Sequence, residues 1–151
     1  MKAIQIVKPN DMQIIDMPMP QIDEVNNVLV KIKVAGICGS DVGIYRGTNA
    51  AATYPRVIGH EIGGVIAEVG PNVKDRKVGE RVIIDQVTSC GECYACRKGQ
   101  PNVCHKLAAR GVHIDGGYRE YMAVPEKDCY VLPDFLRDYD AVMVEPTTIA
   151  I

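Results

Sequence analysis

Four cysteines crowd into one short stretch of this 151-residue chain and constrain its fold more than any other feature. The stretch spans fifteen residues and contains Cys90, Cys93, Cys96 and Cys104. Such crowding does not suit unstrained disulfide pairs, whereas C-x-x-C spacing aims two sulfurs at one point and suits tetrahedral zinc. We expect a structural zinc site here, closed by four thiolates. Four unliganded thiols and a rubredoxin-type iron centre are the alternatives, and the latter normally uses two separated C-x-x-C pairs.

Composition limits the classes of protein to consider. With 47% hydrophobic residues, residues 1–151 can form the core of one domain but hardly of two. The net charge is −2, Lys and Arg form no run, and one Phe without Trp offers no base-stacking platform, so we expect no nucleic-acid partner. We find neither a signal peptide nor a membrane span. Clustered metal-binding thiols favour a reducing compartment, the cytoplasm.

Short alternating segments predict a mainly β fold. In Val28–Val34, apolar residues share one face and Lys31 and Lys33 the other, which is typical of a half-buried strand. Similar runs occur at 3–7, 13–16, 64–69, 81–85, 118–124 and 129–132. We expect an antiparallel barrel or strongly curled sheet. Helical character begins only near Asp138, and Pro146 should kink that helix or end one of its turns.

A second, looser group of metal-binding residue types lies upstream. It includes Cys38 in Gly36–Asp41 and the pair His60 and Glu61. Taken singly, such a cysteine is more often a small core residue and such a histidine a hydrogen-bonded structural one. No G-x-G-x-x-G or G-x-x-x-x-G-K-[ST] motif occurs, so the sequence contains no recognisable nucleotide-phosphate loop.

The motif around His60 resembles a known family signature. Its pattern is G-H-E-x-x-G-x(5)-G-x-x-V, at Gly59, His60, Glu61, Gly64, Gly70 and Val73. Together with the C-G-S-D block and the four cysteines, it is similar to the zinc-containing medium-chain alcohol/polyol dehydrogenases. The blocks YPRVIGHE, GVHIDGG and VMVEP most resemble the polyol, threonine and hexonate members, including the L-gulonate/L-galactonate 5-dehydrogenase and starvation-sensing group. The resemblance implies a GroES-like antiparallel β-barrel with a zinc-binding lobe and a C-terminal helix leading to a Rossmann domain absent from this sequence.

The resemblance implies a role for each residue that matches a functional position of the family. Cys38 and His60 match two fixed ligands of a catalytic zinc, and Glu61 and Glu145 compete for the third place. Asp41 matches the carboxylate that orients the zinc-binding histidine. Ser40 matches the hydroxyl that hydrogen-bonds the alcohol.

The implied enzyme oxidises a secondary alcohol of a polyol or sugar acid to a ketone. It uses two zinc ions per chain and NAD or NADP, and when full length it is a homo-oligomer, a dimer or tetramer. Alternatives are a threonine or short-chain alcohol dehydrogenase, a zinc-stabilised binding module and a chaperone-like subunit. Residues 1–151 alone are expected to be inactive, because they contain no cofactor site.

Gly43, His113 and Arg56 lie outside the predicted ligand sets. Gly43 stands where many family members have a proton-relay histidine, so the usual relay is missing; water or, less readily, His113 could replace it. A substrate contact or a loop role is the favoured interpretation of His113. Arg56 could attract an acidic substrate or form a structural ion pair.

Two residues receive structural interpretations. His105 is interpreted as a surface neighbour of the cysteines. Cys129 is interpreted as a buried small hydrophobe.

Overall fold

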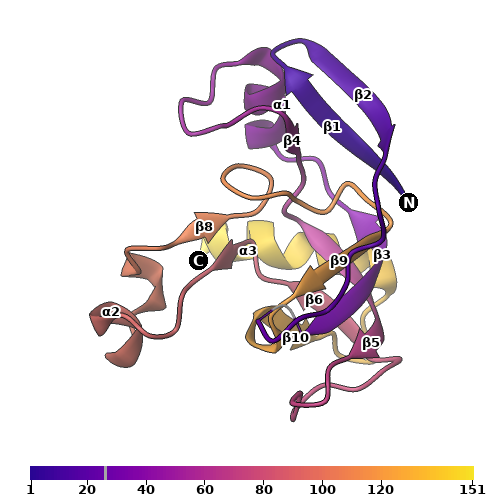
Figure 1. Ribbon diagram of the computed structural model, residues 1–151, viewed down its shortest axis with the longest axis vertical. Coiled ribbons are helices and arrows are strands. Elements are labelled where there is room, and N and C mark those ends of the chain that lie inside the picture. The colour runs from indigo at the N-terminus through magenta and orange to yellow at the C-terminus, as the bar shows by residue number, and fades with distance from the viewer. Residues whose placement is uncertain (26) are drawn as a thin grey trace.

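The computed structural model describes residues 1–25 and 27–151 (Figure 1). The strands are β1 (Lys2–Lys8), β2 (Asp11–Asp16), β3 (Val28–Ala35), β4 (Arg56–Val57), β5 (Ile62–Val69), β6 (Arg81–Ile84), β7 (Val87–Thr88), β8 (Ala108–Ala109), β9 (Tyr121–Val124) and β10 (Cys129–Val131). The α-helices are α1 (Gly39–Arg46), α2 (Tyr94–Arg97) and α3 (Val144–Ala150). The 3-10 helices are η1 (Pro101–Val103), η2 (Glu126–Asp128) and η3 (Asp138–Met143).

A five-stranded antiparallel sheet in the order β10-β6-β5-β3-β9 carries the main core. The alternation predicted for Val28–Val34 is confirmed, because Val30 is buried while Lys31 and Lys33 are exposed. One face of the sheet packs a cluster of nine buried residues: Val28, Val30, Ile62, Ile66, Val82, Ile84, Met122, Val124 and Cys129. The interpretation of Cys129 as a buried hydrophobe is confirmed, since its side chain is fully buried there.

A smaller antiparallel sheet, β2-β1-β4, joins the first through residues 118–120. The amide of Ile4 donates to the carbonyl of Tyr118 at 2.8 Å, and the amide of Ile32 donates to that of Glu120 at 2.9 Å. The mainly β, antiparallel prediction is confirmed. The closed barrel is corrected: within residues 1–25 and 27–151, β9 and β10 are the edges of the five-stranded sheet and do not pair with each other.

The cysteine lobe, residues 89–107, extends from the two-stranded sheet of β7 and β8. Figure 1 shows α2, within this lobe, lying well away from the five-stranded sheet. A buried ion pair lies where the lobe meets the sheet: Arg110 donates to Asp128 at 2.5 Å and to the carbonyl of Asp85 at 3.0 Å. The exposed fractions of Arg110 and Asp128 are 3% and 4%. This pair therefore ties the base of the lobe to the end of β6.

The helices differ partly from the prediction. The C-terminal helical segment is confirmed, as η3 followed by α3, and Pro146 lies in the first turn of α3, where a missing N–H breaks no helical hydrogen bond. The expectation that helical character is confined to this segment is wrong, because α1 is an eight-residue helix. Gly39, its first residue, and Gly43, in its interior, lower its helix propensity, so its sequence gives no strong helical pattern.

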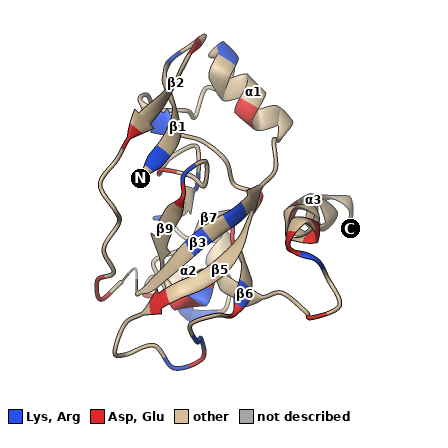
Figure 2. Cartoon of the chain, turned by 90° about the vertical axis from the view of Figure 1, so that its right-hand side faces the viewer, with Lys and Arg blue, Asp and Glu red and all other residues tan. Residues whose placement is uncertain are grey.

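Charged residues of both signs are interspersed along the chain, as Figure 2 shows. Among the described residues, none of the helices is both long and apolar enough to cross a membrane.

Candidate metal centres

The four cysteines of the lobe converge on one point. All four Sγ atoms lie within 4.8 Å of one another, with 3.5 Å between Cys93 and Cys96 and 3.9 Å between Cys93 and Cys104. Zinc–sulfur bonds of about 2.3 Å in a tetrahedron require sulfur–sulfur separations of about 3.8 Å. A disulfide would need about 2.05 Å, and all four cysteines are free. The lobe therefore has the donor set and spacing of a closed tetrahedral zinc site.

Local backbone geometry produces this convergence. Gly91 and Gly99 have φ angles of 76° and 73°, a left-handed conformation that bends the chain beside the cysteines at little cost. Backbone amides also point at sulfur: those of Cys90 and Lys106 donate to Cys104 Sγ at 3.4 and 3.3 Å. The backbone of Cys96 holds the pKa of the Cys93 thiol down to about 5, because a nearby N–H stabilises the thiolate.

A second group forms where the β3 and β5 strands meet. Cys38 follows β3 and caps α1, while His60 and Glu61 immediately precede β5. Because Ala35 pairs with Ile62 across these strands, the two segments are brought together. One ligand atom each from Cys38, His60 and Glu61 lies within 4.8 Å of the other two. Cys38 and His60 were predicted as ligands and Glu61 as one of two candidates for the third place, and the fold brings these three residues together.

Asp41 lies beside this group and contacts both segments that carry it. Its carboxylate is buried, 2% exposed, and accepts hydrogen bonds from the amides of Cys38 at 3.0 Å and Gly59 at 3.2 Å. His60 Nδ1 lies 3.7 Å from Asp41 Oδ1 and, buried, has no hydrogen-bond partner within the described residues. Burial of an imidazole nitrogen without a hydrogen-bond partner costs free energy, unless the ring also binds a ligand. A metal ion at the Cys38–His60–Glu61 group would supply that hold.

Glu61 is buried against the backbone of Gly36. A Cβ added to Gly36 would lie 2.0 Å from Glu61 Oε2, so only glycine leaves room for this carboxylate. Burial raises the pKa of Glu61, opposed by His60 and reinforced by Glu145 and Asp41. A metal cation is the partner that would stabilise such a buried carboxylate in its charged form.

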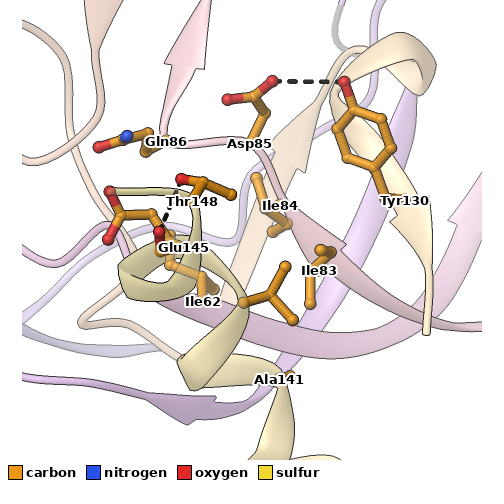
Figure 3. Close-up of a pocket in the computed structure, with 10 residues that line it drawn as sticks. Ile62, Ile83, Ile84, Asp85, Gln86, Tyr130, Ala141, Glu145 and Thr148 are labelled. Atoms are coloured by element: carbon orange, nitrogen blue, oxygen red, sulfur yellow. Dashed lines mark hydrogen bonds between the residues drawn. The ribbon is translucent and has the colours of Figure 1, made fainter. Parts of the chain in front are cut away.

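The predicted residue Glu145 lies outside the group of three. It is the second residue of α3, and its carboxylate lines a cavity of about 360 Å³ (Figure 3). The wall of this cavity includes Ile62, Ile83 and Ile84. In Figure 3, Gln86 and Asp85 lie across from the turn of α3 that carries Glu145. The cavity thus combines an apolar wall with several hydrogen-bonding groups.

Other predicted residues lie apart or serve the fold. Ser40 is half-buried in the first turn of α1, next to Asp41. His113 is exposed, and its Nδ1 accepts the amide of Ala109 at 3.0 Å, which is a loop-stabilising contact. Arg56 pairs with Asp115 at 3.0 Å, which favours the structural ion pair over an acidic-substrate contact. His105 is exposed beside the cysteines, as interpreted from sequence.

Tyr118 is a neighbour of the candidate site that the sequence motifs did not indicate. Its hydroxyl donates to the carbonyl of Gly36 at 2.7 Å and contacts Asp41 Oδ2 at 3.3 Å. Burial is the main cause that raises the pKa of Tyr118, which keeps the phenol protonated. These contacts cross 82 and 77 residues of sequence, and no local pattern announces them.

The chain is similar to known proteins in sequence. Residues 24–134 match the family model described as the alcohol dehydrogenase GroES-like domain. Over 150 residues the chain is 55% identical to starvation-sensing protein RspB of Escherichia coli K12, covering 99% of this chain and 44% of that protein. It is 41% identical over 126 residues to L-galactonate-5-dehydrogenase of the same strain, covering 83% of this chain and 36% of that protein.

A solved structure agrees with the fold. The crystal structure of a short chain alcohol dehydrogenase (rspB) from E. coli CFT073, complexed with the cofactor NADH, has a TM-score of 0.89 and 54% sequence identity. The match covers 99% of this chain and 43% of that chain. Both the sheets and the cysteine lobe thus belong to the GroES-like class of domain.

The chain belongs to the alcohol dehydrogenase GroES-like domain family, and the resemblance inferred from its motifs is confirmed. The chain spans less than half the length of the relatives described above.

Proposed function

We propose that residues 1–151 form the zinc-binding catalytic domain of a dehydrogenase that oxidises a secondary alcohol of a polyol or sugar acid to a ketone with NAD or NADP. The observation that carries the proposal is the contrast between two donor groups in one chain. The lobe offers four sulfurs and forms a closed site. The Cys38–His60–Glu61 group offers one sulfur, one nitrogen and one oxygen donor, which leaves a coordination position for substrate.

Each side chain of the mixed group has a proposed task. Cys38, His60 and Glu61 hold the metal, and Asp41 fixes the orientation of His60. A zinc ion bound there supplies Lewis acidity, which lowers the pKa of an alcohol hydroxyl. The Ser40 hydroxyl would accept the proton of that alcohol while it releases its own. Because Gly43 has no side chain to pass the proton on, water carries it away.

Glu145 and the cavity that it lines are the proposed substrate side of the site. Carboxylate and amide groups accept or donate hydrogen bonds to sugar hydroxyls, while the isoleucine wall contacts the carbon chain. Glu145 is the alternative to Glu61 for the third ligand place, directly or through water. No nucleotide-phosphate motif occurs in these 151 residues, whereas the crystallised rspB protein, which is more than twice as long, is complexed with NADH.

The cellular location that we propose follows from the chemistry of the cysteines. Thiolate zinc sites need reduced cysteines, which supports a cytoplasmic location. We propose a homo-oligomer for the full-length enzyme.

Metal analysis of the purified chain tests the proposal. We expect two zinc ions per wild-type chain, one after Cys38→Ala and one after Cys93→Ala. Cys129→Ala is the matched control, because Cys129 is a core residue that belongs to neither donor group, and its loss should leave two zinc ions. A wild-type chain with a single zinc that survives Cys38→Ala would contradict the catalytic assignment and favour a zinc-stabilised binding module.

A further inference from the structure

Tyr118 spans the two segments that carry the Cys38–His60–Glu61 group. Its hydroxyl reaches the first segment, at Gly36 and Asp41, as described above. Its ring covers the second segment at Gly59, where an added Cβ would lie 2.3 Å from the ring. Gly59 has a φ angle of 96°, so both its conformation and its lack of a side chain suit this contact. One side chain therefore touches the residue before His60 and the residues around Cys38.

The backbone of Tyr118 is itself fixed on both sides. Its amide donates to the carbonyl of Ile58 at 3.0 Å, and its carbonyl accepts the amide of Ile4 at 2.8 Å. The first bond joins it to the segment leading to His60, and the second joins it to β1. The ring and hydroxyl consequently start from a rigid base, as a group that orients others must.

The hydroxyl has one hydrogen and two acceptors. The hydroxyl donates to the carbonyl of Gly36 at 2.7 Å and to Asp41 Oδ2 at 3.3 Å, so these two acceptors share its one hydrogen. Asp41 Oδ2 also accepts the amide of Cys38, and its other oxygen faces His60 Nδ1. Rotation of the carboxylate would break these contacts together. The Tyr118 hydroxyl limits that rotation from the side opposite His60.

We propose that Tyr118 is a positioning residue for the Cys38–His60–Glu61 metal group, acting through Asp41 and Gly36. This inference rests on the proposed function, because it needs a metal ion at that group. Removing the hydroxyl should leave the ligands in place but less well oriented. Loss of such an outer partner typically lowers metal affinity about 10- to 100-fold.

The test measures zinc affinity by competition with a chromophoric chelator in the 151-residue chain. Tyr118→Phe retains the ring over Gly59 and removes only the hydroxyl, so we expect the weaker-binding zinc of the Cys38 group to lose about 10- to 100-fold in affinity. The matched control is Tyr54→Phe, which removes another half-buried hydroxyl from a backbone carbonyl, that of Ile44. Tyr54→Phe should leave the affinity unchanged.

A double-mutant cycle with Asp41→Asn identifies the route of the effect. If Tyr118 acts through Asp41, the two substitutions together should weaken binding clearly less than the product of their separate effects. Affinity in Tyr118→Phe equal to that in Tyr54→Phe, or fully multiplicative effects in the cycle, would overturn the inference. Failure of the proposed function is distinct, because wild type and Cys38→Ala would then bind the same number of zinc ions.

Discussion

At the residue scale, Arg110 and Asp128 form a buried ion pair that the fold must compensate. Burial lowers the pKa of Arg110 and raises that of Asp128, so each charge depends on the other for compensation. Arg110 also donates to the backbone of Asp85. The pair thus links three segments at the base of the cysteine lobe, and it matters more than the exposed ion pairs elsewhere.

We expect Arg110→Met to destabilise the chain by about 3–5 kcal/mol, because it leaves Asp128 buried without its partner. Urea unfolding of the zinc-loaded protein measures this change in the free energy of unfolding. The double variant Arg110→Met/Asp128→Leu should recover part of the loss, since it removes both charges. A single variant within about 0.5 kcal/mol of wild type would show that water or another group compensates Asp128.

Site residues that lie close together in the sequence were easier to predict than those that only the fold brings together. The four cysteines lie so close in sequence that spacing alone predicts their convergence. Cys38, His60 and Glu61 needed the family motif, because their meeting depends on the pairing of β3 with β5. Tyr118 was missed, since a tyrosine in a strand-like run is indistinguishable from a packing residue until the fold brings it to Asp41.

At the element scale, the strands were predicted better than the helices. Alternation identifies a strand from its own residues. In contrast, α1 is fixed by its ends: Asp41 accepts the amide of Cys38 at its start, and Gly47 ends it with a φ of 76°. Closure of the sheet was overestimated, because which strands remain at an edge depends on long-range pairing that no single segment encodes.

The start of η3 should respond to acid. Asp140 accepts the amide of Arg137 at 2.8 Å and its Nε at 3.0 Å, and chiefly the side-chain contact lowers the pKa of Asp140 to about 2. The lowered pKa of Asp140 stabilises the folded state fully above the ordinary carboxyl value of 3.8, and this effect is lost as the pH falls toward about 2. Asp140→Asn should therefore flatten the fall of the thermal midpoint between these two values.

The difference between wild type and Asp140→Asn is the readout, because acid also protonates the thiols of both proteins. The effect should be small, since Arg137 is exposed and solvent screens its charge. Glu24→Gln, an exposed change away from η3, is the control and should follow wild type. Parallel curves for wild type and Asp140→Asn would argue against the contribution of this carboxylate.

At the scale of the whole molecule, the chain divides into a sheet with an apolar core and a lobe without one. Within the lobe, all of whose residues are described, Cys104 is the single buried residue. The main cluster of buried apolar side chains lies on the five-stranded sheet. Stability of the lobe must then come mainly from its metal, and that of the sheet from packing.

Removing zinc with a chelator under reducing conditions should loosen the lobe and leave the sheet folded. Hydrogen exchange measures both parts in one experiment: amides of residues 90–106 should lose protection, including those of Cys90 and Lys106 that donate to sulfur. Amides of β3 and β5 should keep most of theirs. Equal loss of protection in the sheet would show that the lobe supports the core as well.

The unequal sequence distances within the two metal groups also set an order of assembly. Cys90 and Cys104 are 14 residues apart, so an unfolded chain can already gather these ligands at a small cost in loop closure. By contrast, Cys38 and His60 are brought together only when β3 pairs with β5, and the Tyr118 contact with Asp41 spans 77 residues. A nascent chain can therefore acquire its first metal ion before it has a fold, whereas the second must wait for one.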